Sequence, residues 1–91
     1  MRLTKTTKLP KTFLISIKLK SGRCGYLRYR SVVDDMGKIR YDVHFTTRMV
    51  EASRFLNVEN TKLRAKNLLT ELNLPGVEVI DESNGRRHVI H

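Results

Sequence analysis

The chain has 91 residues, and its 18 lysines and arginines against 9 acidic residues give it a formal charge of +9. A chain of this length folds as one small domain with one modest core, which excludes a large enzyme with a deep substrate cavity. Its 40% apolar and 30% charged residues are typical of a folded domain and not of a disordered chain.

Cys24 is the one cysteine, so the chain cannot form an internal disulfide, and no Cys and His spacing suggests a metal site. The longest apolar run, at residues 13–15, is far shorter than a membrane span. The first residues lack the apolar segment of a secretory signal. We therefore expect a cytoplasmic protein with no membrane contact, no metal and no cofactor.

The positive charge is concentrated in the first third of the chain. Residues 1–33 contain nine basic residues and no acidic residue, whereas residues 34–91 contain nine of each. Charges segregated in this way repel one another unless an anionic partner binds them. The distribution favours a polyanion such as nucleic acid as the partner, and the alternative is a role in keeping the protein in solution.

Residues 1–11 carry a basic residue at every third position: Arg2, Lys5, Lys8 and Lys11. Pro10 disfavours helix for the residue before it, so we predict a flexible basic arm. Its four basic residues are candidate nucleic-acid-binding residues that would add contacts on the backbone or in a groove. A single domain at residues 12–91 follows this arm.

Three segments alternate apolar and polar residues, at 12–20, 25–33 and 39–46, and each predicts a strand. Glycine-containing turns separate them, and Gly37 suits the left-handed position of the second turn. Strands joined in this way form an antiparallel meander with one apolar face. Other elements of the chain must pack on this face to bury its apolar side chains.

The spacing of apolar residues then changes to a helical period. It predicts a short helix from Thr46 or Thr47 to about Leu56 and a second helix from a Thr61 cap to about Leu72, separated by a break at residues 57–60. Two apolar stripes would cover the sheet, one of Met49, Ala52, Phe55 and Leu56 and the other of Ala65, Leu68, Leu69 and Leu72. One bent helix is the alternative.

Asn84 and Gly85 lie between two runs that contain apolar residues, which predicts a hairpin with a two-residue turn within residues 77–91. This turn pairs Glu82 with Arg87, where opposite charges favour the register. The predicted fold class is therefore α+β, a three-stranded antiparallel meander covered by two helices, plus a C-terminal β-hairpin.

If the apolar faces of the strands point inward, their outer faces form a basic surface. Its candidate nucleic-acid-binding residues are Lys18, Lys20, Tyr26, Arg28, Arg30 and Arg40, with His44 beside them and Arg23 in the adjoining turn. An Arg guanidinium can bind a phosphate or the edge of guanine with two hydrogen bonds. Five phosphate contacts, from Lys18, Lys20, Arg28, Arg30 and Arg40, give a log–log salt slope of about −4.5 on duplex DNA.

Aromatic side chains decide between single-stranded and duplex targets. We expect Phe13, Phe45, Tyr29 and Tyr41 in the core, which leaves only Tyr26 on the outer face. Binding of single strands needs several aromatics on which bases stack. The sequence therefore favours duplex DNA or structured RNA, and it leaves the choice between these two open.

Residues 25–56 contain four short motifs in order: Gly25-Tyr26-Leu27-Arg28-Tyr29-Arg30, Asp35-Met36-Gly37-Lys38, Phe45-Thr46-Thr47 and Glu51-Ala52. In these motifs the segment resembles the arm-type DNA-binding domains of phage and transposon integrases. The resemblance implies a sheet in the major groove, with Arg28, Arg30 and Arg40 against DNA. Small phage accessory proteins, including inhibitors of bacterial defence systems, show similar patterns.

We therefore predict a nonenzymatic nucleic-acid-binding accessory protein of phage or mobile-element origin, acting in the host cytoplasm. The alternative is a phage inhibitor of a host defence nuclease, whose partner would be a host protein or nucleoprotein. Cys24 and the histidines show no spacing that indicates a catalytic pair, so we expect no catalysis. The oligomeric state stays open.

Overall fold

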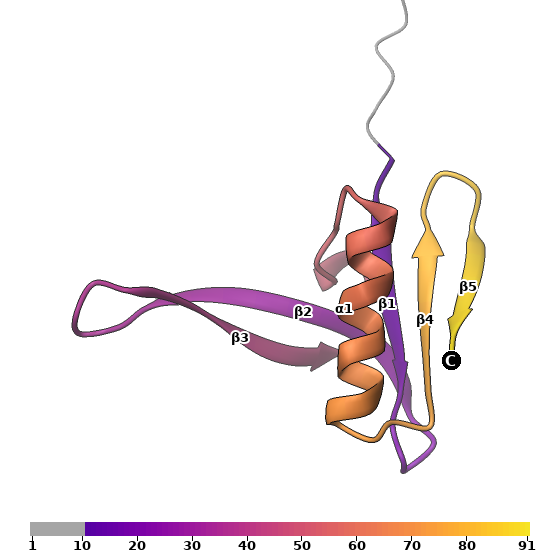
Figure 1. Cartoon of the computed structure of the whole chain (residues 1–91), viewed down its shortest axis with the longest axis horizontal. Coiled ribbons are helices and arrows are strands. Elements are labelled where there is room, and N and C mark those ends of the chain that lie inside the picture. The colour runs from indigo at the N-terminus through magenta and orange to yellow at the C-terminus, as the bar shows by residue number, and fades with distance from the viewer. Residues whose placement is uncertain (1–10) are drawn as a thin grey trace, which may run out of the picture.

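The computed structural model describes residues 11–91, which form one five-stranded antiparallel sheet with a helix on one face (Figure 1). The strand order is β3-β2-β1-β4-β5. The elements are β1 (Phe13–Lys18), β2 (Cys24–Val33), β3 (Ile39–Thr46), the 3-10 turn η1 (Met49–Glu51), α1 (Val58–Glu71), β4 (Gly76–Asp81) and β5 (Arg86–Ile90). The prediction of an α+β fold is confirmed, and the three predicted strands pair as a meander. The predicted arm lies outside the described residues except for Lys11.

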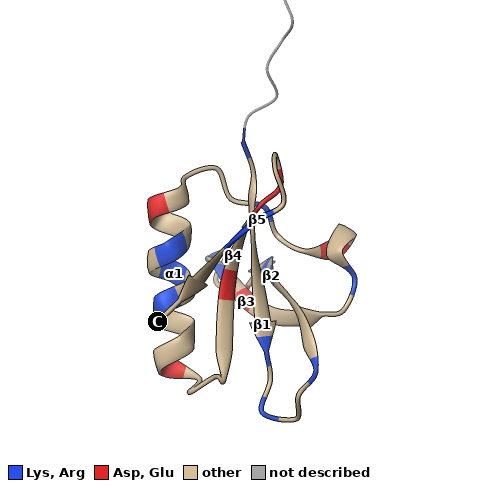
Figure 2. Cartoon of the chain, turned by 90° about the vertical axis from the view of Figure 1, so that its right-hand side faces the viewer, with Lys and Arg blue, Asp and Glu red and all other residues tan. Residues whose placement is uncertain are grey.

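β1 is the central strand, and both of its faces are covered. Its alternation directs Phe13, Ile15 and Ile17 into the core beneath α1, where Val77 and Val79 of β4 join them. On the opposite face Leu14 forms a second cluster with Ile80, Ala52 and Tyr26. Figure 2 shows α1 on one side of the sheet and the short helical turn η1 on the other. The body of the molecule therefore has three layers around β1.

The prediction of a helix at residues 46–56 is wrong. Only the turn η1 forms there, and the chain then extends and forms a bridge between Phe55 and Phe13, with two backbone hydrogen bonds of 2.9 Å. Three hydrogen bonds link Ser53 to β2. Its N–H donates to Leu27 O (3.0 Å), its Oγ accepts the Tyr29 N–H (2.7 Å), and its hydroxyl donates to the Tyr29 carbonyl (3.3 Å). β2 pairs with β1 only from Cys24 to Tyr26. Where β1 and β2 diverge, their backbone N–H and C=O groups lose each other as partners, and this segment supplies hydrogen bonds to them. These tertiary hydrogen bonds outweigh the helical periodicity of the segment.

The second predicted helix is confirmed, but its start is wrong. Asn57 is the N-cap, and its side-chain oxygen accepts a hydrogen bond from the Asn60 N–H (2.9 Å). Thr61 lies one turn inside the helix, buried, and its hydroxyl donates to the Asn57 carbonyl (2.6 Å). Residues 57–60 are therefore the first turn of α1 and not a break.

The C-terminal hairpin forms in a register shifted by two residues from the predicted one. Asp81 pairs with Arg86, so the loop between them has four residues. The Gly85 N–H donates a hydrogen bond to Asp81 O (2.7 Å) within this loop. Arg87 therefore contacts Glu78 (3.2 Å), and Glu82 instead binds Arg54. The hairpin is also not a separate unit, because β4 pairs with β1 along its whole length.

Past Tyr26 the β2–β3 hairpin diverges from β1 and projects sideways from the body (Figure 1). Its turn is the predicted one: Gly37 has a φ of 77°, and the Asp34 carboxylate accepts the N–H groups of Met36 and Lys38 (2.9 Å each). No residue from 28 to 46 is buried. The prediction that Tyr41 belongs to the core is wrong, since 67% of its surface is exposed. α1 packs along β1 and β4 and does not follow the hairpin, so it leaves this part of the apolar face uncovered (Figure 1).

Candidate nucleic-acid interface

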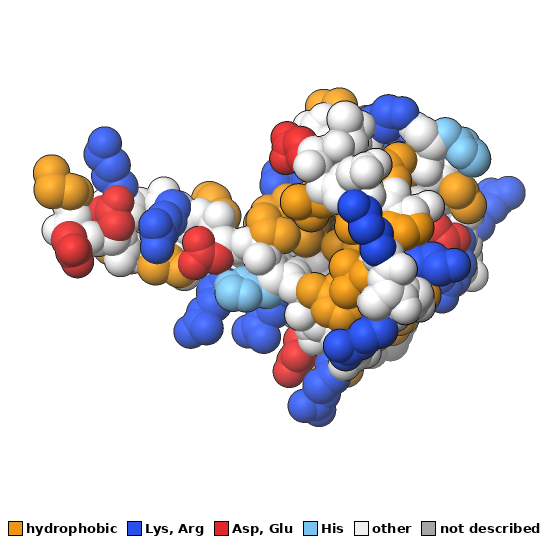
Figure 3. Space-filling model, turned by 90° about the horizontal axis from the view of Figure 1, so that it is seen from below, with side chains coloured by type: hydrophobic (Ala, Val, Ile, Leu, Met, Phe, Trp, Pro, Cys, Tyr) orange, Lys and Arg blue, Asp and Glu red, His pale blue; other side chains and the backbone are white. Residues whose placement is uncertain are grey.

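The β2–β3 hairpin carries a basic face on the side turned away from α1. Its members alternate with the apolar residues, and cross-strand pairing sets Arg28 opposite His44, Arg30 opposite Asp42, and Val32 opposite Arg40. Arg28, Arg30, Arg40 and His44, which we call the basic hairpin face, are all exposed. Figure 3 shows Lys and Arg side chains beside a histidine where the hairpin leaves the body.

Two carboxylates lie beside these cations. Glu51 lines a shallow hollow of about 210 Å³ together with Arg28, Arg30 and His44. The Glu51 carboxylate already has two partners: it accepts a hydrogen bond from the Thr46 hydroxyl (2.8 Å) and lies 3.8 Å from the Arg48 guanidinium.

The second carboxylate, Asp42, lies 3.9 Å from Arg40. Within residues 11–91, neither Arg28 nor Arg30 has a carboxylate oxygen within 4.0 Å. Their guanidinium donors therefore remain free for an external anion.

The remaining predicted residues are more dispersed. Lys18 pairs with Cys24, four residues along β2 from Arg28, which is about 13 Å in an extended strand. Lys20 lies in the exposed turn between β1 and β2, and Lys11 is exposed at the start of the described chain. Arg2, Lys5 and Lys8 lie outside the described residues.

Two predicted residues pack against other side chains of the protein. The Arg23 guanidinium lies 6.0 Å from the centre of the Phe45 ring, which packs on the α1 side of the sheet. Tyr26 packs against the core cluster of Leu14, Ala52 and Ile80. The basic hairpin face therefore offers no freely exposed aromatic ring.

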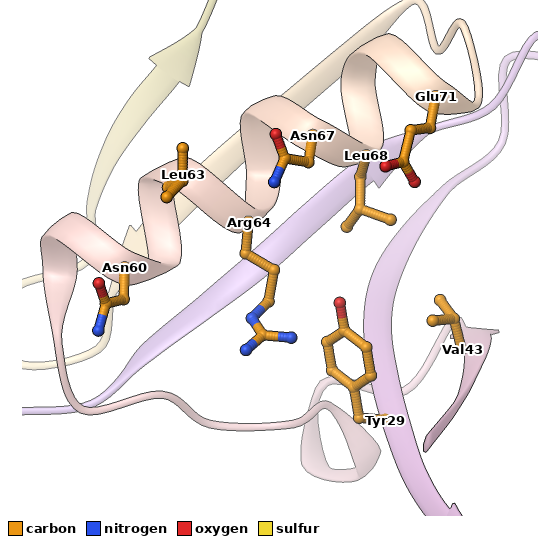
Figure 4. A pocket seen from close by; sticks show the side chains of 8 residues that line it. All are labelled: Tyr29, Val43, Asn60, Leu63, Arg64, Asn67, Leu68 and Glu71. Atoms are coloured by element: carbon orange, nitrogen blue, oxygen red, sulfur yellow. The ribbon is translucent and has the colours of Figure 1, made fainter. Parts of the chain in front are cut away.

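Arg64 of α1 is a functional candidate that the sequence analysis missed. Its guanidinium carbon lies 4.8 Å from the centre of the Tyr29 ring and 5.4 Å from that of Phe55, a cation–π arrangement. Figure 4 shows Arg64 and Leu68 pointing from α1 toward Tyr29, with Val43 beyond it. The helical period places Arg64 beside Ala65 at the edge of the apolar stripe, but nothing local in the sequence indicates its aromatic partners.

The described residues hold no metal-binding cluster: no three His, Cys, Asp or Glu side chains between residues 11 and 91 come together in this way. α1 is neither long nor apolar enough to cross a membrane. One carboxyl group has a shifted pKa: hydrogen bonds from the Ser83 hydroxyl and N–H lower the pKa of Asp81. These bonds hold the β4–β5 turn, so Asp81 has a structural role.

No protein-family model, curated protein or solved structure matches this chain. The resemblance to integrase arm-type domains and to phage accessory proteins therefore stays a prediction.

Proposed function

We propose that this chain is a nonenzymatic nucleic-acid-binding protein whose basic hairpin face contacts duplex DNA or structured RNA. The observation that carries the proposal is the pair Arg28 and Arg30, exposed on one face of a projecting hairpin and, within residues 11–91, with no carboxylate oxygen within 4.0 Å. Two planar guanidinium groups two residues apart on one strand suit adjacent phosphates or a phosphate and a base edge.

The shape of the hairpin supports a duplex target. A two-stranded ribbon fits the major groove of B-DNA, which is about 12 Å wide. The outer part of β2 has only β3 as a strand neighbour among the described residues, so its basic face is accessible from the tip to the body. Single-strand binding is less suited to this face because it lacks stacking aromatics.

A fluorescence anisotropy titration with labelled duplex DNA, an RNA hairpin and a single strand tests the proposal. Arg28→Ala/Arg30→Ala is expected to weaken duplex or hairpin binding by about tenfold or more, because each lost phosphate or base contact removes roughly 1 kcal/mol or more. Arg86→Ala/Arg87→Ala removes the same charge from the far edge of the sheet and should change affinity by less than about threefold. Equal losses in the two variants contradict the proposal.

A second experiment tests the alternative, that the chain is a phage inhibitor of a host nuclease. Pull-down from bacterial lysate, with and without nuclease digestion, separates a nucleic-acid partner from a protein one. Loss of all captured material after digestion supports the proposal. A single nuclease retained after digestion, and released by Arg28→Ala/Arg30→Ala, overturns it in favour of the inhibitor.

A further inference from the structure

The face of the β2–β3 hairpin on the α1 side is apolar and largely uncovered. Its strand positions, which we call the apolar hairpin face, are Tyr29, Ser31, Val33, Ile39, Tyr41 and Val43. No residue of this set is charged, whereas the reverse face of the same two strands carries Arg28, Arg30, Arg40 and Asp42. Val33, Ile39 and Tyr41 are each about two-thirds exposed. Alternation this strict is typical of a strand pair with one buried face.

A groove joins this face to the helix. It has a volume of about 470 Å³ and lies where the hairpin leaves the body, with Tyr29 and Val43 on one side and α1 on the other (Figure 4). The side chains from α1 are Leu63 and Leu68 together with the polar Asn60, Arg64, Asn67 and Glu71. Leu63 is 62% exposed. The apolar surface thus runs from the hairpin tip to α1 without interruption by a charged strand residue.

We propose that this surface binds a second copy of the chain. The two apolar hairpin faces pack against each other in antiparallel orientation, so that the tip of each hairpin lies over the groove of its partner. Each copy carries an apolar tip, with Val33 and Ile39, and at the opposite end of the same face a groove in which Leu63 and Leu68 lie among polar side chains of α1. A two-fold axis brings each tip to the other groove, as a self-complementary interface requires.

The amount of apolar surface agrees with a dimer. The exposed parts of Val33, Ile39, Tyr41, Val43 and Leu63, backbone and the Tyr41 hydroxyl included, amount to at most roughly 600 Å² per copy, at the upper end of what a monomer exposes in one patch. Two such patches total roughly 1,200 Å², the lower end of a specific interface. An isolated two-stranded hairpin is also marginally stable in water, and a partner sheet supplies the layer it lacks.

The charge distribution favours a second copy over a polyanion at this face. Two chains of formal charge +9 repel each other, but the basic hairpin face lies on the reverse side of the same strands. Packing the apolar faces together leaves both basic faces pointing outward. Nucleic acid has no cationic strand residue to bind on the apolar side. The proposal does not depend on nucleic-acid binding, since it rests on the opposite face.

Sedimentation velocity of the full chain across a concentration series tests the dimer. The wild type is expected to sediment as a dimer at micromolar concentrations. Ile39→Thr and Tyr41→Thr, which keep strand-forming residues, should each raise the dimer dissociation constant about tenfold or more. Val32→Thr is the matched control on the reverse face of the same hairpin and should leave the constant within about twofold.

Leu63→Ser on α1 tests the position of the partner's tip. It should weaken the dimer like Ile39→Thr, because the tip of one copy covers the groove of the other. A wild type that stays monomeric at millimolar concentration overturns the proposal. So does a dimer insensitive to both Ile39→Thr and Leu63→Ser, which would point to pairing through the open edge of β3. Circular dichroism of each variant shows that it remains folded.

Discussion

The body around β1 and the projecting part of the β2–β3 hairpin both consist of alternating strands, but they bury their side chains to different extents. In the body, Leu14, Ile15 and Val79 are fully inaccessible, because β1 and β4 lie between two layers of cover. In the hairpin, no residue from 28 to 46 is buried. Folding stability therefore resides in the body, and the surfaces for partners reside in the hairpin. Substitutions in the two regions should have separable effects.

The largest effect on stability is expected in the body. Ile15→Ala removes a fully buried side chain from the central strand and should lower the free energy of unfolding by about 2–5 kcal/mol. Arg30→Ala, in the exposed hairpin, should lower it by less than about 0.5 kcal/mol. Urea unfolding at low protein concentration measures both. Similar losses for the two variants would refute the division into body and hairpin.

Gly25 is where the hairpin leaves the body, and we predict that it tolerates no side chain. A Cβ there would lie 2.4 Å from the Phe45 ring and 2.6 Å from the Thr46 carbonyl oxygen. Gly25→Ala should cost about 1–3 kcal/mol of unfolding free energy, because ring and backbone must both shift. Gly76→Ala is the matched strand control, since its nearest atom would be Lys18 Cβ at an ordinary 3.8 Å. Thermal unfolding of the two variants checks this difference.

Ser53 connects the two regions and should have an intermediate effect. Its hydroxyl accepts the Tyr29 N–H (2.7 Å) and donates to the Tyr29 carbonyl (3.3 Å), where β1 no longer pairs with β2. Ser53→Ala leaves both backbone groups without this partner, at a cost of about 1–2 kcal/mol. Ser31→Ala on the exposed hairpin should be close to neutral. Amide exchange at Tyr29 should accelerate in Ser53→Ala only, and unchanged exchange would contradict this role.

The smallest effect concerns the β4–β5 turn and depends on pH. The Ser83 bonds lower the folded-state pKa of Asp81 below its ordinary value of 3.8, which we take for the unfolded chain. The resulting stability is present above that unfolded pKa and is lost as the pH falls through the folded pKa. Ser83→Ala should therefore be less stable than wild type at pH 7, and the difference should shrink below about pH 4. NMR titration of the Asp81 carboxyl should show a higher pKa in Ser83→Ala. A difference in stability that stays constant from pH 7 to pH 3 would contradict the assignment.

Local patterns predicted the strands and the basic hairpin face, but not the elements that depend on distant contacts. Period-2 alternation places Arg28 and Arg30 opposite Tyr29, and the structure has that register. The predicted helix at residues 46–56 does not form because this segment makes backbone hydrogen bonds with Phe13 and Leu27, which are distant in the sequence. Tyr41 is exposed because α1 (Val58–Glu71) packs along β1 and β4 and not along the hairpin, and no pattern near Tyr41 encodes where the helix packs. Periodicity predicts a face, but whether that face is covered depends on the rest of the fold.

The most direct test of the central claim is the salt dependence of duplex DNA binding in the wild type and in Arg28→Ala/Arg30→Ala. Each phosphate contact contributes about −0.9 to the log–log slope, so losing two contacts should make the slope shallower by about 1.8 while the thermal unfolding midpoint stays within a few degrees. An unchanged slope, with both proteins folded, would contradict the assignment of the basic hairpin face to nucleic acid.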